Sequence, residues 1–377
     1  MLEKYAKIRK DFHNHPELSG REQRTAGQII QHLQSVAPSA VYTSIGGYGI
    51  VAEYTFSPTG PTLLFRADTD AVAIPETLAV PYRSVNAGVS HKCGHDGHTS
   101  ILLAFAELLH QHPLQQGKII LLFQPSEENG KGAQAVLQDS YFRHLKIDRA
   151  FALHNLPGFP YNNIICRPGS FTCSVISCTI RIQGKTSHAA EPEKAIPPVP
   201  ALLKILKATE SWNCNELNSA DYFRSTLIEL HIGEEAYGVT AGDGLIRLTL
   251  RASTEANLQE HIRKLENLVK EEVSLDKEIS YTMEWVEAFV ANENHPTAVK
   301  TIQKAAGNKQ LLYIENDRPF AWGEDFGLFT QHFPGAMFGL GAGTETSALH
   351  TPDYDFPDEI IATGAQIFYE IARLENL

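Results

Sequence analysis

The sequence predicts an α/β protein in which a mixed, mostly parallel sheet carries helices on both faces and is interrupted by an inserted α+β domain. Apolar runs of strand length alternate with helical patterns through the first 168 residues, and this order is typical of a parallel sheet. After residue 168, longer alternating strands take over. A chain of 377 residues is also too long for one compact core. We therefore expect a larger domain of residues 1–168 and 290–377, and an inserted domain of residues 169–289.

Local patterns define the elements of the larger domain. Apolar residues three and four positions apart predict helices, and short, predominantly apolar runs predict strands. The second helix ends before Pro38, because proline does not continue a helix. In chain order, these patterns give helices over 2–12 and 22–36, strands over 49–56 and 62–67, a helix over 99–110, a strand over 118–123, a helix starting at Glu127, and helix–sheet alternation again from His295.

The inserted domain is expected to have strands in which apolar and polar residues alternate, because one face of such a sheet is buried and the other is exposed. A cluster of prolines at positions 197, 198 and 200 marks the approach to its first helix. In chain order, the patterns give a strand over 174–182, a helix after the prolines, strands between 227 and 251, a helix over 257–273 and a strand over 280–287.

Composition excludes several classes of function. Lysines and arginines number 32 against 44 acidic residues, for a formal net charge of −12, which argues against a nucleic-acid partner. The apolar stretch 101–109 is interrupted by Glu107 and is too short to span a membrane, and residues 1–10 lack the apolar region of a signal peptide. Five cysteines, an odd number without regular spacing, suggest reduced thiols. We expect a cytoplasmic protein with no membrane partner.

The segment 93–98 has the sequence Cys-Gly-His-Asp-Gly-His, which places possible metal donors and an acid within six residues. Thiolate and imidazole suit Zn²⁺ and its neighbours in the first transition row, and the glycines allow a tight backbone. Adjacent glutamates, Glu127 and Glu128, follow a predicted strand. Paired glutamates are common on solvated helices. Beside a metal, however, Glu128 can bind the ion while Glu127 acts as the general base toward water.

Two further histidines, His154 and His350, end apolar stretches. Each alone would more often be a hydrogen-bonded core residue than a ligand. Together with the donors above they make a set of five, and if one of the five bridges, two divalent cations receive three protein ligands each, the pattern of a catalytic site. Zn²⁺ suits these donors, and Mn²⁺, Co²⁺ and Ni²⁺ remain alternatives. The five candidate ligands are Cys93, His95, Glu128, His154 and His350.

Carboxylates near the candidate ligands have more than one interpretation. Asp68 and Asp70 follow a strand and could cap a turn, but next to a metal they better fit the orientation of an imidazole. Asp96 is a candidate N-cap for a helix starting at Thr99, and His98 is equally a packing residue or a site residue.

Motifs for other hydrolases are absent: no serine has a G-x-S-x-G context, and no H-E-x-x-H occurs.

These residues give the chain a resemblance to a known family along nearly its whole length. It resembles the amidohydrolase branch of the dinuclear-metal aminoacylase and glutamate carboxypeptidase family, which includes hippurate hydrolases and auxin-conjugate hydrolases. The matching segments are 13–18, 66–71, 93–98, 124–128, 153–155, 187–190, 323–326 and 349–352.

The resemblance implies a metal-dependent hydrolase that cleaves N-acyl amino acids, with the five ligands above, Glu127 as base and Asp68 or Asp70 supporting the site. It also implies that the inserted domain is a lid that forms a homodimer, and that His188 helps to stabilise an oxyanion, often in the partner's active site. A dipeptidase or carboxypeptidase with the same metal centre is the alternative enzyme, and a non-catalytic metal-binding homologue is the alternative of another class.

The inserted domain departs from the family at one place. Relatives usually carry an asparagine followed by an Ile-Pro pair, whereas this chain has Gly238 in the corresponding position. A contact to substrate is therefore expected to be missing. Arg251, on a following strand, could hold a substrate carboxylate through two parallel hydrogen bonds, although an exposed strand arginine is the more common explanation of such a residue.

Overall fold

The computed structural model describes residues 2–275 and 277–376 of the protein. These residues form two compact units, one within 1–171, 292–317 and 324–377, and the other of 172–291 with 318–323. The second unit therefore begins three residues later than the insertion expected from residues 169–289. It also includes the segment 318–323, because Phe320 pairs with Thr172 and its carbonyl accepts a hydrogen bond from the Cys173 amide at 3.0 Å.

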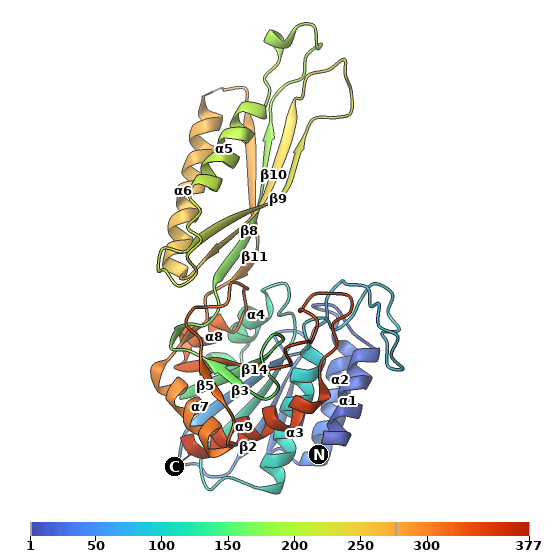
Figure 1. The fold of residues 1–377 in the computed structure, drawn as a ribbon, viewed down its shortest axis with the longest axis vertical. Helices are drawn as coiled ribbons and strands as arrows, with labels where there is room; N and C mark the ends of the chain where they lie inside the picture. The colour runs from blue at the N-terminus through green and yellow to red at the C-terminus, as the bar shows by residue number, and fades with distance from the viewer. Residues whose placement is uncertain (1, 276, 377) are drawn as a thin grey trace. The chain divides into compact units, whose positions relative to one another are not determined.

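The first unit is built on an eight-stranded mixed sheet whose central strands are parallel (Figure 1). Strands β4, β3, β5 and β14 run parallel to one another. Antiparallel pairs join β1 to β2, β2 to β4 and β6 to β14. The order across the sheet is β1 (Ala40–Ile45), β2 (Gly49–Thr55), β4 (Lys118–Gln124), β3 (Thr62–Asp68), β5 (Arg149–Leu156), β14 (Gly335–Gly341), β6 (Ile164–Cys166) and β13 (Tyr313–Glu315). The predicted fold class is confirmed.

Helices cover both faces of this sheet. A group of long helices packs together, with α3 contacting α1, α2 and α9, and α9 contacting α7, while the shorter α4 and α8 contact each other and reach β4 and β14. The helices are α1 (Leu2–Asn14), α2 (Gln23–Leu33), α3 (His95–Gln111), α4 (Gly132–Gln138), α7 (Pro296–Asn308), α8 (Gly327–His332) and α9 (Ile361–Glu375). Strands β7 (Gly169–Ser170) and β12 (Glu293–Asn294) pair with each other as a separate two-stranded sheet of this unit.

An aromatic cluster fixes α3 and α9 against the centre of the sheet. Phe65 of β3 has its ring centroid 4.9 Å from that of Phe105 on α3 and 5.2 Å from that of Phe368 on α9. Phe151 of the neighbouring β5 stacks on it at 5.4 Å. Aromatic pairs at such distances add to the free energy gained by burying their surface. This packing holds the N-terminal end of α3 beside the carboxyl ends of β3 and β5.

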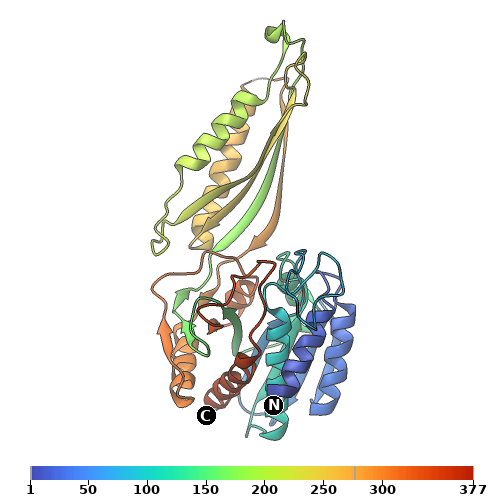
Figure 2. The ribbon, with the colours of Figure 1, turned by 45° about the vertical axis from the view of Figure 1, so that its right-hand side comes forward.

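The second unit is a four-stranded antiparallel sheet with two helices packed together on it (Figure 2). Along β10, buried side chains alternate with more exposed ones, so that one face of the strand meets the helices, as its sequence predicts. The order is β11 (Ser280–Phe289), β8 (Ser174–Gln183), β10 (Asp243–Ala252) and β9 (Phe223–Ile232), and the helices are α5 (Val199–Ser211) and α6 (Glu255–Ser274).

Two predicted helix starts were wrong, and both lie next to candidate ligands. Helix α3 begins at His95 and not at Thr99, so Asp96 lies in its first turn and is not its N-cap. Glu127 and Glu128 do not begin a helix: they lie in a turn, and α4 starts at Gly132. Every helix within 2–275 and 277–376 is too short or too polar to cross a membrane.

Candidate metal centre

The carboxyl ends of the parallel strands bring the candidate residues to one edge of the sheet. Asp68 ends β3 and pairs with Gln124, which ends the adjacent β4. Glu127 and Glu128 lie in the turn that follows β4, and His154 lies near the end of β5. Parallel strands place ligand-binding residues at this edge because their carboxyl ends all meet there.

Glycines in the segment 93–98 allow it to lie close to its neighbours. Gly94 has a φ of 93°, and a Cβ there would lie 2.6 Å from the Asn155 side-chain oxygen. At Gly97 a Cβ would lie 2.2 Å from the ring of Phe356. A larger residue at position 94 would push the segment away from β5, and one at position 97 would push the start of α3 away from Phe356. The glycines that looked permissive in the sequence are therefore sterically required.

Two histidines direct Nε2 toward the same region. His95 Nδ1 donates to the Asp70 carbonyl at 3.0 Å, and His154 Nδ1 donates to the Asn155 carbonyl at 2.9 Å. Because a carbonyl can only accept, each Nε2 keeps its lone pair in the neutral ring. The pKa of His154 lies well below its usual value, chiefly because of burial. Both rings are therefore arranged as metal-binding imidazoles are, with the other nitrogen held by an acceptor.

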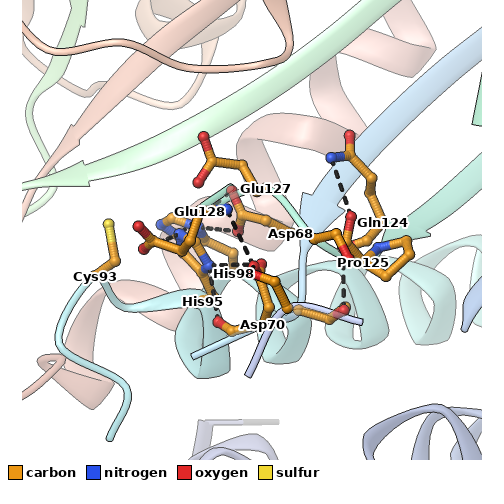
Figure 3. A network of polar contacts seen from close by, with 12 residues as sticks. Asp68, Asp70, Cys93, His95, His98, Gln124, Pro125, Glu127 and Glu128 are labelled. Carbon is orange, nitrogen blue, oxygen red and sulfur yellow. Dashed lines mark hydrogen bonds and ion pairs between the residues drawn. The ribbon is translucent and has the colours of Figure 1, made fainter. Parts of the chain in front are cut away.

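The structure brings all five predicted ligands together, in two groups that share one residue. The ligand atoms of Cys93, His95 and His154 lie within 4.8 Å of one another, and so do those of Cys93, Glu128 and His350. His350 Nε2 is 3.5 Å from Glu128 Oε1, and Cys93 Sγ is 3.5 Å from His154 Nε2. Figure 3 shows Glu128 pointing toward Cys93 and His95. Cys93 is the common member of the two groups.

Asp68 and Asp70 contact the histidines and the turn after β4. Asp68 Oδ1 accepts from His98 Nδ1 at 2.6 Å, and Asp68 Oδ2 lies 3.7 Å from His95 Nε2. Asp70 Oδ2 accepts from the Glu128 amide at 3.0 Å, while its backbone carbonyl orients His95 (Figure 3). Both carboxylates thus hold residues that carry candidate ligands. His98 also bonds Asn155 Oδ1 at 2.5 Å, so it connects β3 with β5.

Asp96 has a different role from the predicted cap. Its Oδ2 accepts from His13 Nδ1 at 2.8 Å and lies 3.7 Å from the Arg9 guanidinium, so it fastens the start of α3 to α1. Although burial lowers it, hydrogen bonds to Asp96 and Glu76 raise the pKa of His13 to about 9. The protonated imidazole can then donate to both carboxylates.

Sequence reasoning gave no role to a buried cation behind the site. Arg66 is 1% exposed and its guanidinium donates to Asp68 at 2.7 Å, to Asp325 at 2.7 Å and to Glu324 at 2.9 Å. Its Nε donates to Gln124 at 2.9 Å. An arginine inside an otherwise apolar strand was the available signal, because such a residue is buried only when paired.

Glu127 lies against this network, in a strongly negative environment. The Asp325 amide approaches Glu127 Oε1 at 3.4 Å, and ligand atoms of Glu127, Glu324 and Asp325 lie within 4.8 Å of one another. Burial raises the pKa of Glu127 well above its usual value, and the carboxylates of Glu324, Glu128 and Asp325 raise it further, whereas Arg66 opposes them. A positive charge bound at this edge of the sheet would lower the pKa of Glu127 again.

Divalent cations fit the arrangement on two counts. His95 Nε2 and Glu128 Oε1 are buried and face each other at 3.7 Å, and neither has a hydrogen-bond partner within the described part of the chain. Such orphaned atoms are costly unless something binds them. In addition, although burial opposes it, Asp68 with Asp70 and Glu128 raises the pKa of His95 to about 10, so the site attracts positive charge. The donor set of thiolate, imidazole and carboxylate suits Zn²⁺ and related ions.

The other two predicted site residues belong to the second unit. Arg251 borders a cavity of about 390 Å³ and donates from Nη1 to the Ala321 carbonyl at 2.9 Å. His188 Nδ1 accepts from the Ala190 amide at 3.0 Å, so the neutral ring carries its proton on Nε2. Gly238 is beside His188 in the structure, since its carbonyl accepts from the Ala189 amide, and it has open space where a side chain would be.

Comparison with known proteins identifies the family of the chain. The profile of peptidase family M20/M25/M40 matches residues 64–374, most of the chain. The chain belongs to this family. Its membership agrees with the resemblance inferred from the sequence motifs and identifies the protein as a hydrolase of the M20 group.

Individual M20 relatives align over almost their full lengths. A putative amidohydrolase, YhaA, of Bacillus subtilis is 31% identical over 97% of this chain and 93% of its own. An N-acetyl-L-cysteine deacetylase of the same species is 29% identical over 97% and 86%. Among solved structures, the YXEP protein of Bacillus subtilis, described as a dinuclear metal binding peptidase of family M20, superimposes with a TM-score of 0.84 at 25% identity, covering 100% of this chain and 99% of that one.

Proposed function

We propose that this M20 protein is a metal-dependent amidohydrolase that cleaves the amide bond of N-acyl amino acids, releasing a carboxylate and an amino acid. The observation that carries the proposal is the position of Glu127, a buried carboxylate with an oxygen within 4.8 Å of ligand atoms of His95 and Glu128, two of the five candidate metal donors. The relative named as a deacetylase of N-acetyl-L-cysteine supports the substrate class.

Two divalent cations would be held by two sets of three residues. Cys93, His95 and His154 would form one set and Cys93, Glu128 and His350 the other, so that Cys93 is the residue shared by both. Three ligands for each ion leave positions for water and substrate, as catalytic sites require. We propose Zn²⁺, since thiolate and imidazole suit it, with Mn²⁺, Co²⁺ and Ni²⁺ as alternatives that metal analysis of the purified protein will separate.

The remaining chemistry belongs to residues of the chain. Divalent cations supply Lewis acidity, which polarises a carbonyl and lowers the pKa of water. Glu127 takes one proton from the attacking water as the new C–O bond forms, and gives that proton to the amide nitrogen as the C–N bond breaks. Asp68 and Asp70 hold His98, His95 and the Glu128 backbone in place. His188, whose Nε2 is the donor, would stabilise the oxyanion.

A substrate panel tests this function against its alternatives. N-acetyl, N-benzoyl and aminoacyl derivatives of the same amino acids are incubated with metal-loaded protein, and amine release is measured. Turnover of the acyl derivatives and not of the aminoacyl ones supports the amidohydrolase. The reverse preference indicates a dipeptidase or carboxypeptidase, and no turnover with both ions bound indicates a non-catalytic metal-binding protein.

We propose that Arg251 binds the substrate carboxylate. Aromatic and cationic side chains, which suit an amino acid, make up most of its cavity lining: Tyr222, Arg224, Thr226, Arg251, Ala321 and Trp322. Arg251→Met should raise KM about 10- to 100-fold with little change in kcat, because a hydrogen bond to a charged group contributes about 1.5–3 kcal/mol. Initial-rate kinetics measure this.

The matched control for Arg251 lies on the same strand. Arg247 is exposed and paired with Glu229, so Arg247→Met should leave KM unchanged. A substrate amide that lacks the carboxylate should show equal KM with the natural protein and with Arg251→Met. If Arg251→Met binds the acidic substrate as well as the natural protein does, the carboxylate lies elsewhere.

We also propose a cytoplasmic homodimer formed through the second unit. Strand β9 is an edge of its sheet, and it exposes Leu227, Ile228 and Leu230. An edge strand with exposed apolar side chains readily pairs with another chain. Sedimentation of the full chain measures the oligomeric state, and a monomer at micromolar concentration would contradict this assignment.

All five cysteines are unpaired, in keeping with a reducing compartment.

A further inference from the structure

One buried lysine connects segments that carry the candidate ligands. Lys92, directly before Cys93, has a fully buried side chain. Its Nζ donates to Glu76 Oε1 at 2.7 Å and to the Tyr354 carbonyl at 2.8 Å. Lysine is almost never buried unless it is paired, since removing an ammonium from water is costly. Its place among the ligand segments raises the question of what it does there.

Lys92 holds the segment 350–354 at both ends. Its own carbonyl accepts a hydrogen bond from the His350 amide at 2.7 Å, while its ammonium binds the carbonyl of Tyr354. His350 depends on such support. Its φ is 61°, an unusual value for a residue with a side chain, and its imidazole is 51% exposed. Packing therefore contributes little to the position of this ring.

Tyr354 extends the connection to a third segment. Its buried hydroxyl accepts from Asn155 Nδ2 at 2.6 Å, and Asn155 directly follows His154 on β5. A continuous chain of hydrogen bonds thus joins the residue before Cys93, the loop of His350 and the strand of His154. These hydrogen bonds hold the three segments together, and none of them uses a metal-donor atom of the five candidate ligands.

Glu76 anchors the opposite side of the lysine. Its Oε1 also contacts His13 Nε2 at 2.8 Å, and its Oε2 accepts from the Ser84 amide at 2.7 Å. Glu76 therefore keeps a cationic partner and a backbone donor when the ammonium of Lys92 is removed. The substitution of Lys92 is for this reason expected to loosen the loop without leaving an isolated buried charge.

We propose that Lys92 is a positioning residue that fixes His350 against Cys93 and thereby sets the affinity of the cation held by Cys93, Glu128 and His350. The inference rests on the proposed metal centre and names a residue that contacts neither substrate nor cation. Residues that orient metal ligands typically contribute 10- to 100-fold in metal affinity. The effect should be larger for this cation than for the other, because Nζ contacts the loop of His350 directly and reaches the strand of His154 only through Tyr354 and Asn155.

The test is the Zn²⁺ affinity of the full-length Lys92→Met variant, measured by competition with a chromophoric chelator and by metal content. One of two Zn²⁺ ions should bind about 10- to 100-fold more weakly, with the other affected less. Lys118→Met is the matched control: Lys118 pairs with Glu53 at 3.2 Å at the start of β4, and its loss should leave both ions unchanged. Unchanged affinity in Lys92→Met overturns the proposal.

A double-substitution cycle separates positioning from general destabilisation. His350→Ala should weaken the same Zn²⁺, and adding Lys92→Met to it should cause no further loss, because the lysine acts through the imidazole. A further, additive loss overturns the proposal. Retention of both ions by His350→Ala instead refutes the metal centre itself. Should Lys92→Met not fold, Glu76→Gln, which weakens the anchor of the ammonium, is expected to loosen the same ion and serves as the test.

Discussion

Glu127→Gln is expected to lower kcat by about 10²- to 10⁴-fold while both metal ions remain bound. The amide has nearly the shape of the carboxylate, but it cannot accept a proton from water. Glu128, the proposed metal ligand, is unchanged, and the Asp325 amide can still contact the side-chain oxygen of residue 127. Steady-state kinetics with an N-acyl amino acid, together with elemental analysis, measures both parts of this prediction.

The control is a glutamate of the same unit that lies away from the site. Glu107 on α3 accepts hydrogen bonds from Tyr5 and Lys4, and Glu107→Gln should retain full activity. Turnover that survives Glu127→Gln would exclude Glu127 as the base and leave water activation to another group. Loss of metal in Glu127→Gln would show instead that Glu127 is a ligand.

Arg66→Met should lower the free energy of unfolding by about 3–5 kcal/mol, because it removes the buried cation and leaves its carboxylates in place. Asp68, Glu324 and Asp325 each lose a hydrogen bond from the guanidinium, and all three are buried. Methionine fills much of the volume, so the loss reports charge and hydrogen bonding more than packing. Chemical denaturation followed by circular dichroism measures the change.

The pH dependence of this loss distinguishes charge from packing. A buried carboxylate without its cation has a higher pKa in the folded state than in the unfolded state, so it destabilises the protein at high pH. This destabilisation decreases as the pH falls below the folded-state pKa and disappears below the unfolded-state pKa. The difference between Arg66→Met and the natural protein should therefore be larger at pH 8 than at pH 5. A difference independent of pH would indicate a packing defect.

Arg247→Met provides the surface control. Arg247 on β10 pairs with Glu229 on β9, and the two side chains are 45% and 40% exposed. Exposed ion pairs contribute about 0–1 kcal/mol, so this variant should unfold close to the natural protein. An equal loss in the two arginine variants would contradict the special role given to burial at Arg66.

Local patterns in the sequence were enough to predict the strands that deliver the site. The strands predicted at 62–67 and 118–123 match β3 and β4 to within one residue at their carboxyl ends, where the site lies. They were predictable because a strand buried on both faces needs continuous apolar side chains. Helix starts were less predictable. The helix start predicted at Glu127 is five residues early, because a turn occupies residues 127–130 before α4 begins at Gly132. The start predicted at Thr99 is four residues late, because the helical backbone begins directly after Gly94.

The network around Arg66 could not be inferred from spacing. Its partners come from positions 68, 124, 324 and 325, and contacts across more than 250 residues have no periodic signature. The same holds for Lys92, which in the sequence is only an ordinary charged residue before a motif. Tertiary packing makes it a link between loops.

The sequence by itself determined which side chains can donate to a metal, which carboxylates accompany them, and which strands end beside them. Only the tertiary structure decided that Cys93 belongs to both groups of donors, that Asp96 binds His13 in place of capping a helix, and that 318–323 joins the second unit. The physical reason is that donor chemistry resides in single residues, whereas distances between remote residues depend on how sheets and loops pack together.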